Sequence, residues 1–225
     1  MTVEPDSYRR SPRVTLERRR ERGSYDKDGV HAILDSSALC QIGYVAGGQP
    51  LVLATIYWRL GERLYWHGSR QSRALQAMAG AQVCFTVSRL DGLVLARSAF
   101  RHSANYRAVM AFGVAREVAG QTQKLAALKA MIERLYPGRW AQIRGPTPAE
   151  LAATTVLFLE LDEVSAKIRA DPPLDPDADL AIPVWAGVAP VTLTPGKLEP
   201  CAKLQAEAQA SPGMIDWTAI GSTDG

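Results

Sequence analysis

The sequence contains few of the residues that build disulfide frameworks and metal centres. It has three cysteines and three histidines in 225 residues. Cys40, Cys84 and Cys201 are far apart, odd in number and in no CxxC pair, which argues against a disulfide framework and against a zinc site. Because Cys40 and Cys84 lie within apolar strand patterns, we expect both to be buried, unreactive thiols.

The sequence also lacks long apolar segments. No apolar run approaches the roughly 18 residues of a membrane-spanning helix, and residues 1–20 contain no apolar segment of the signal-peptide type. We therefore expect a cytoplasmic protein with no membrane partner. The composition, 47% hydrophobic and 22% charged, is that of a globular protein with one sizeable core.

Recognisable catalytic motifs are absent as well. The chain has no HExxH, no glycine-rich phosphate loop and no convincing Ser-His-Asp order, so no residue is predicted to be catalytic. His31 and His102 are interpreted as bystanders. His67 lies in a strand among aromatic residues, where a structural role and contact with a cofactor or substrate are both open.

Positive charge is concentrated at the start of the chain, although the net charge is only +3. Only Glu17 and Glu21 offset the arginines there, which are Arg9, Arg10, Arg13, Arg18, Arg19, Arg20 and Arg22. We favour a solvated arm whose later part packs on the domain, so nucleic acid is not an expected partner. A regulator that contacts nucleic acid through this arm is the alternative.

Hydrophobic patterning predicts a mainly β domain with flanking helices. A short helix over 29–37, capped by Asp28, precedes three antiparallel strands over 38–45, 51–58 and 64–68. The Asp91-Gly92 pair predicts a hairpin between strands over 82–90 and 93–100. Later segments predict strands over 106–120, 154–170 and 182–193 and helices over 72–80, 122–137 and 147–153. A closed or partly open barrel would protect the strand edges.

Composition also predicts the domain boundaries. Residues 1–22 form the basic arm, residues 23–170 the folded domain, and residues 171–225 an extension that begins with a proline and aspartate linker. We expect this extension to pack partly on the barrel or on a dimer mate.

The stretch "LYWHGSRQSRALQAM" has the parts of an anion site. A helix that begins near Gln71 presents unpaired N–H groups and the positive end of its dipole. Ser69 and Ser72 add hydroxyl groups, and Arg70 and Arg73 add charge. The alternative is a serine N-cap with solvated arginines.

The ordered series "GQP", "LYWHGS..SRALQ", "VCFTV" and "YRAVMAFGVAREV" resembles the flavin-binding split-barrel superfamily of pyridoxamine 5'-phosphate oxidase, and within it the nitroimidazole-reductase-like branch. The resemblance covers about residues 20 to 195. It implies a six-stranded antiparallel split β-barrel of the FMN-binding type, which forms a homodimer with FMN at the subunit interface.

The resemblance also implies site residues. The Ser-Arg-Lys phosphate turn of the oxidases matches Ser72 and Arg73, but Ala74 replaces the lysine, and Ala108 replaces a serine that is frequent in this branch. FMN binding weaker than in the oxidases is one expectation. The implied cofactor-binding set is Thr55, Ile56, Tyr57, Trp66, His67, Gly68, Ser69, Ser72, Arg73, Tyr106 and Arg107.

The function implied by the resemblance is that of an FMN-dependent oxidoreductase. Such a protein reduces small aromatic, nitro or quinone-type substrates with electrons from a reduced nicotinamide, and the flavin supplies the chemistry. The alternatives are a non-catalytic flavin-binding protein, a protein that binds haem or a deazaflavin instead, and the regulator with the basic arm.

Overall fold

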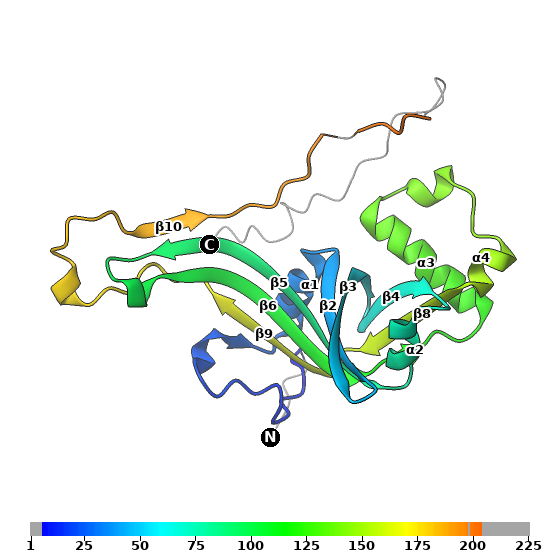
Figure 1. Ribbon diagram of the computed structural model, residues 1–225, viewed down its shortest axis with the longest axis horizontal. Helices are drawn as coiled ribbons and strands as arrows, with labels where there is room; N and C mark the ends of the chain where they lie inside the picture. Colours follow the sequence, from blue (N-terminus) through cyan, green and yellow to red (C-terminus); the bar gives the residue numbers. More distant parts are fainter. Residues whose placement is uncertain (1–5, 198, 204–225) are drawn as a thin grey trace.

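The computed structural model describes residues 6–197 and 199–203, and within these the chain forms one curved antiparallel sheet with helices against its middle and at one end (Figure 1). The sheet order is β1-β9-β6-β5-β2-β3-β4-β8-β7, and β10 pairs with β5. The strands are β1 (Gly23–Ser24), β2 (Leu39–Ala46), β3 (Gln49–Leu60), β4 (Arg63–Ser69), β5 (Gln82–Leu95), β6 (Ser103–Val114), β7 (Arg116–Glu117), β8 (Thr154–Glu160), β9 (Glu163–Arg169) and β10 (Gly187–Pro190). The α-helices are α1 (Lys27–Asp35), α2 (Arg73–Met78), α3 (Gln121–Leu135) and α4 (Pro148–Ala152). The mainly β architecture is as predicted, but the described chain has ten strands instead of six.

The predicted three-strand meander is present as β2, β3 and β4. Gly47 and Gly48 have φ values of 57° and 75°, which suit the two-residue turn between Ala46 and Gln49. Helix α1 begins after Asp26, whose side chain accepts a hydrogen bond from the Gly29 N–H at 2.7 Å. The predicted cap at Asp28 was therefore two residues late.

The hairpin predicted at Asp91-Gly92 is wrong. Strand β5 continues through both residues to Leu95, with a register shift against β6 between Leu90 and Gly92. The Asp91 carboxylate is held by Arg107 on β6, and Gly92 pairs with Pro190 of β10. A side chain on Gly92 would approach β10 to 2.9 Å, so the glycine permits close strand pairing here and does not make a turn.

The single strand predicted over 154–170 is also wrong, because the chain turns in its middle. Strand β8 pairs with β4, and after the turn β9 pairs with β6 on the other side of the sheet. The Leu161 N–H donates to the Glu62 carbonyl at 2.8 Å, which ties the turn to the β3–β4 connection. The strand predicted over 106–120 likewise divides into the end of β6 and the short β7.

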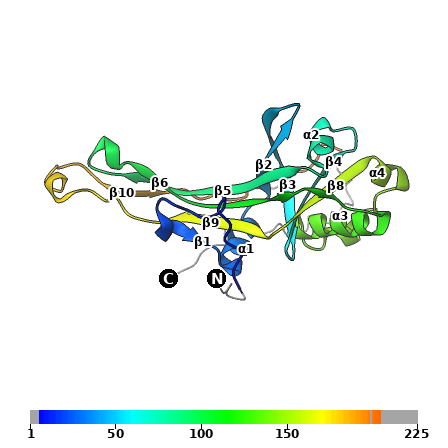
Figure 2. The same ribbon diagram turned by 90° about the horizontal axis from the view of Figure 1, so that it is seen from below.

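The sheet is long and narrow, and its two ends differ. Strands β5, β6 and β10 extend together away from the helices, while α3 and α4 cover the opposite end (Figures 1 and 2). Strand β10 pairs with β5 from Gly187 to Pro190, so the segment after residue 170 adds a strand to the sheet. The predicted strand over 182–193 is therefore present in shorter form.

The basic arm packs on the sheet. Tyr8 and Val14 are buried, and Arg9 and Arg13 form ion pairs with Glu163 on β9. Arg22 pairs with Asp171 at 2.9 Å. The arm is thus held against the domain from its early residues, where only its later part had been expected to pack.

The main core lies between the sheet and helices α1 and α2. Tyr57, Trp66 and Phe85 are fully buried there, and Phe85 makes a T-shaped contact with Tyr57. A second cluster around Trp58 packs under α3.

Cys40 is buried, which raises the pKa of its thiol to about 12, so the prediction of an unreactive thiol is supported at this position. Cys84 is only half-buried. No helix within residues 6–197 is long and apolar enough to cross a membrane.

Tyr57→Phe is expected to lower the free energy of unfolding by about 1 kcal/mol, because the buried Tyr57 hydroxyl donates a hydrogen bond to the Leu34 carbonyl. Urea unfolding followed by tryptophan fluorescence measures the difference. Tyr44→Phe is the control, since Tyr44 is half-buried in β2 and its hydroxyl has no hydrogen bond within the described chain. Equal stability of Tyr57→Phe and wild type would contradict the structural role of this bond.

Candidate functional site

The turn after β4 is ordered by its own serines. The Ser69 hydroxyl accepts from the Gln71 N–H at 3.2 Å, and the Ser72 hydroxyl caps α2 by accepting from the Leu75 N–H at 3.4 Å. A Cβ on Gly68 would lie 2.7 Å from the Leu75 side chain, so glycine lets α2 pack closely on β4. The N-cap interpretation of Ser72 is confirmed, and α2 begins two residues later than expected.

Several hydrogen-bond donors at this turn are available to bind an anion. Within the described residues, neither the backbone N–H groups of Arg73 and Ala74 nor the guanidinium groups of Arg70 and Arg73 have a hydrogen-bond or ion-pair partner. Both arginine side chains are exposed. The hydroxyl proton of Ser72 is also available, because its oxygen only accepts in the cap. These groups together suit one phosphate.

Trp66 and His67 point to opposite faces of β4, as successive strand residues do. Trp66 is fully buried in the main core, and so is Tyr57, so neither offers its side chain to a ligand. His67 lies on the other face, where its ring contacts Trp58 in an edge-on arrangement with centroids 5.8 Å apart. Of the predicted pair on β4, His67 is therefore the one placed beside a cavity.

The cavity beside His67 is an open groove of about 410 Å³ between β4, α3 and the segment that follows α3. Its apolar walls are formed by Leu128, Met131, Ile132, Trp140 and Ile143. The groove was not anticipated from the sequence. The pattern over 122–137 had predicted a helix but no groove.

The imidazole of His67 is neutral and incompletely satisfied. Burial lowers the pKa of His67, so the ring carries no charge at neutral pH. Its Nδ1 atom is buried without a hydrogen-bond partner among the residues that the structure describes, and the ring lines the groove. A neutral imidazole at an apolar wall is a suitable axial ligand for iron in a porphyrin.

The other histidines are placed differently. The Nε2 atom of His31 lies 2.7 Å from the Tyr8 hydroxyl, which in turn donates to Glu62 at 2.8 Å. His31 is therefore occupied within the protein. His102 is exposed, and its Nδ1 atom lies 2.9 Å from the Ser98 carbonyl oxygen. No group of three or more His, Cys, Asp or Glu side chains in the described part of the chain could hold a metal ion.

Strand β3 offers an apolar edge. Ile56 is 44% exposed, and it lines a pocket of about 290 Å³ together with Leu39, Tyr136 and Leu193. Thr55 is half-buried, and its carbonyl accepts from the Cys40 thiol at 3.4 Å.

Tyr106 and Arg107 lie away from the phosphate turn. They are on β6, which β5, β2 and β3 separate from β4 in the sheet. Arg107 makes a two-pronged ion pair with Asp91, with Nε and a terminal nitrogen at 3.0 and 2.9 Å from the two carboxylate oxygens. One chain thus presents the predicted site residues as two groups, at β3–β4–α2 and on β6.

Comparison with known proteins identifies the family. Residues 26–168 match the family model described as pyridoxamine 5'-phosphate oxidase, and the chain belongs to this family. A search of curated protein sequences found no match.

Solved structures show the same fold. The flavocytochrome Anf3 from Azotobacter vinelandii is 38% identical, with a TM-score of 0.86, and the match covers 89% of this chain and 94% of that one. The FAD and heme binding protein from Mycobacterium smegmatis is 34% identical, with a TM-score of 0.82 over 85% and 94% of the two chains. A 5-nitroimidazole antibiotic resistance protein from Bacteroides thetaiotaomicron, 18% identical with a TM-score of 0.52 over 65% and 86%, shares the fold.

Proposed function

We propose that this protein is a redox protein of the flavocytochrome type, which binds a flavin and a haem. The observation that carries the proposal is the 38% identity to a flavocytochrome across 89% of this chain. The relative from Mycobacterium smegmatis, which is 34% identical, is described as binding FAD and heme. Haem was only an alternative to flavin in the sequence analysis, and the two cofactors are now proposed together.

The phosphate of the flavin is assigned to the turn after β4. The guanidinium groups of Arg70 and Arg73 and the first N–H groups of α2 supply donors there, as the unpartnered groups described above indicate. The ring is assigned to the edge of β3 beside Thr55 and Ile56. FMN satisfies these contacts with its single phosphate.

The haem is assigned to the groove beside His67. The neutral imidazole of His67 would coordinate the haem iron, and the apolar side chains of α3, among them Leu128, Met131 and Ile132, would contact the porphyrin. When bound, the flavin supplies two-electron and one-electron transfer and the haem one-electron transfer. The protein contributes position, an apolar surface for the porphyrin and positive charge that holds the phosphate.

Chemical analysis of the purified full-length protein tests this function. Acid extraction and chromatography identify and quantify the flavin, and the pyridine haemochrome assay quantifies haem. The proposal predicts both cofactors in near-stoichiometric amounts when haem precursor is supplied during expression. Protein that retains neither after reconstitution would exclude it.

A second candidate is the reductase of small aromatic, nitro or quinone compounds predicted from the sequence. The apolar pocket of about 290 Å³ beside Ile56 favours it, because a flat substrate could stack there next to the assigned flavin ring. Oxidation of a reduced nicotinamide that depends on added quinone or nitroaromatic compound is the test. A rate equal to that without acceptor would exclude this activity.

We also propose that the protein is a homodimer with the cofactors at the subunit interface. Several apolar side chains on one face of β2 and β3 are exposed, including Val45, Val52 and Ile56, and Val52 is 71% exposed. An interface across this face would also bring the two groups of predicted site residues together from different chains.

Val52→Asp is expected to shift the protein from twice the chain mass of 24.4 kDa toward the monomer mass, because a carboxylate would be buried in the interface. Light scattering coupled to gel filtration measures the mass. Leu60→Asp is the matched control, since Leu60 is similarly exposed at the far end of β3. A wild-type protein that is monomeric would exclude the dimer.

A further inference from the structure

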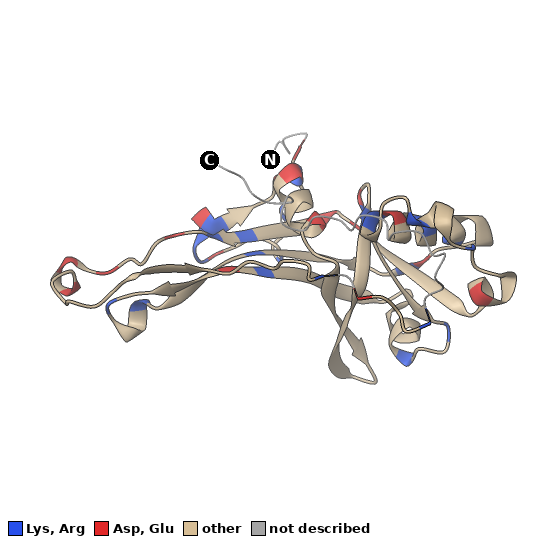
Figure 3. Cartoon of the chain, turned by 90° about the horizontal axis from the view of Figure 1, so that it is seen from above, with Lys and Arg blue, Asp and Glu red and all other residues tan. Residues whose placement is uncertain are grey.

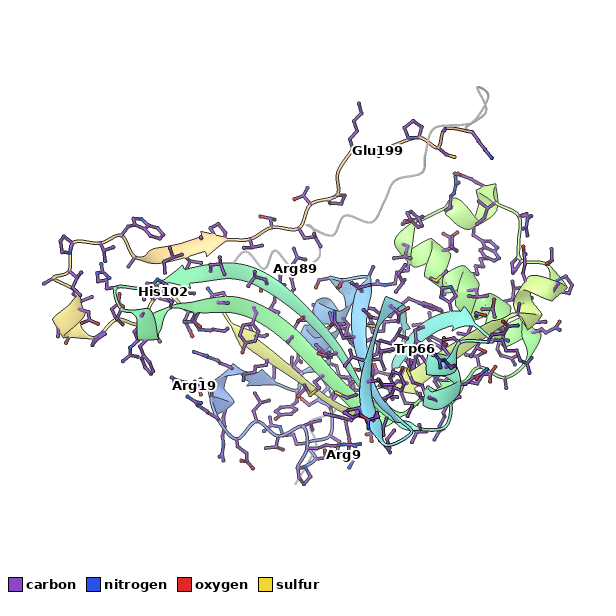
Figure 4. All side chains as sticks on the ribbon, in the orientation of Figure 1. Arg9, Arg19, Trp66, Arg89, His102 and Glu199 are labelled. Carbon is purple, nitrogen blue, oxygen red and sulfur yellow. The ribbon has the colours of Figure 1, made fainter. Side chains whose placement is uncertain are left out.

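A further cavity lies at the end of the sheet opposite helices α3 and α4. The N-terminal arm, the loop before β6 and the end of β9 enclose about 360 Å³ there. In Figure 4, Arg19 and His102 lie at this end and Trp66 at the other. The pocket, called here the arginine pocket, is lined by six cationic side chains, Arg18, Arg19, Arg22, Arg101, Lys167 and Arg169.

The positive charge of the arginine pocket exceeds the negative charge around it. Its lining includes no carboxylate. Glu21 pairs with Arg19 at 3.7 Å, and Asp171 pairs with Arg22 and Arg169 at 2.9 and 3.6 Å. In the described chain the remaining lining cations, Arg18, Arg101 and Lys167, form no ion pair, although Arg101 interacts electrostatically with Asp175 and lies over the Phe100 ring at 5.7 Å. Figure 3 shows the basic segments of the arm and of the neighbouring strand at this end.

The pocket is held in a defined shape at some conformational cost. Arg19 has φ 58°, and it is the only non-glycine residue with positive φ in the described chain. Arg169 is only 6% exposed, and it donates hydrogen bonds to the Asn105 side chain and, at 3.3 Å, to the Asp171 carbonyl. A buried guanidinium and a left-handed arginine therefore flank a space with excess positive charge.

Apolar and aromatic side chains also line the arginine pocket. Phe100 is 88% exposed, and Leu174 is half exposed at the same pocket. Because a carbonyl only accepts, the Nδ1–H of His102 donates to Ser98, which fixes the ring and leaves Nε2 open. Exposed Phe100 offers a stacking surface for a base.

We propose that the arginine pocket binds a dinucleotide through its diphosphate, with Phe100 against the base. The inference rests on the proposed redox function, because two dinucleotides belong to it. One is a reduced nicotinamide dinucleotide as the electron donor, and the other is FAD as the cofactor, in which case the flavin diphosphate lies in this pocket and not at the turn after β4. Two adjacent phosphates match several cations gathered around a small polar space. The propionates of haem are a poorer match, because the two apolar side chains here do not form walls for both faces of a porphyrin.

The test compares the double variant Arg18→Glu/Arg101→Glu with Arg20→Glu/Arg116→Glu. All four arginines are exposed, and the control pair lies outside the pocket but changes the net charge equally. The full-length protein is titrated with ADP and AMP by calorimetry, and with FAD, FMN and NADPH by fluorescence. We expect the pocket variant to bind ADP at least about tenfold more weakly than the control, with AMP much less affected.

The titrations also show whether the bound dinucleotide is FAD or a reduced nicotinamide dinucleotide. Weakened FAD binding with unchanged FMN binding assigns the pocket to the cofactor, whereas weakened NADPH binding assigns it to the electron donor. Equal affinities of both variants for ADP, FAD and NADPH would overturn the proposal, as would an effect confined to haem. The ADP titration needs no bound flavin, so failure of flavin binding in wild type would refute the proposed function without deciding this one.

Discussion

Replacing His67 with alanine is expected to remove haem from the purified protein while the flavin remains. His67 is the histidine that lines an apolar groove, and its lowered pKa keeps the imidazole neutral and able to donate its lone pair to iron. The flavin phosphate is assigned to a separate group of donors after β4. The Soret absorption of the variant, relative to its flavin absorption, measures the effect.

Two control variants make this result specific. His31→Ala and His102→Ala remove the other two histidines, one held by Tyr8 and one exposed beside the arginine pocket. Both are expected to keep haem at the wild-type level. Loss of haem in His102→Ala together with retention of haem in His67→Ala would contradict our account, because it would place the haem beside His102 and not in the groove beside His67.

The double variant Arg70→Ala/Arg73→Ala is expected to bind FMN about 100-fold more weakly than wild type. Each hydrogen bond to a charged group contributes about 1.5 to 3 kcal/mol, and two such losses correspond to at least about two factors of ten. Neither arginine has an ion-pair partner within residues 6–197, so their removal leaves no unpaired carboxylate and the fold is expected to remain intact. Quenching of FMN fluorescence on titration gives the dissociation constant.

The arginine at position 116 provides the control for lost charge. Arg116 is exposed on β7 and lines none of the cavities described above, and Arg20→Ala/Arg116→Ala removes the same charge from the chain. Its FMN affinity is expected to be unchanged. Equal affinities of the two double variants would mean that the turn after β4 does not hold the phosphate.

Local patterns were sufficient to predict much of the fold. The turn between the strands predicted over 38–45 and 51–58 and the helix predicted before Pro137 each depend on neighbouring residues, and each is found in the structure. The wrong predictions concern segments whose structure depends on residues far away in the sequence. Asp91-Gly92 remains in a strand because Arg107 and β10 engage it, and 154–170 turns at Leu161 because β8 and β9 have different partners.

The candidate site was predictable to a similar degree. The serines and arginines of the β4–α2 turn were visible in the sequence, because their spacing is local. The groove beside His67 depends on α3 packing across β4, and the arginine pocket depends on the arm folding against β9, so neither has a signature in consecutive residues. The arginine-rich arm was noticed, but its binding partner within the chain was not.

The measurement that tests the central claim most directly is the anaerobic visible spectrum of the full-length protein as purified, before and after reduction with dithionite. The account predicts flavin absorption that bleaches and a Soret band that shifts on reduction, both remaining with the protein through gel filtration. A protein that shows neither feature, even after incubation with FMN, FAD and haem, would contradict it.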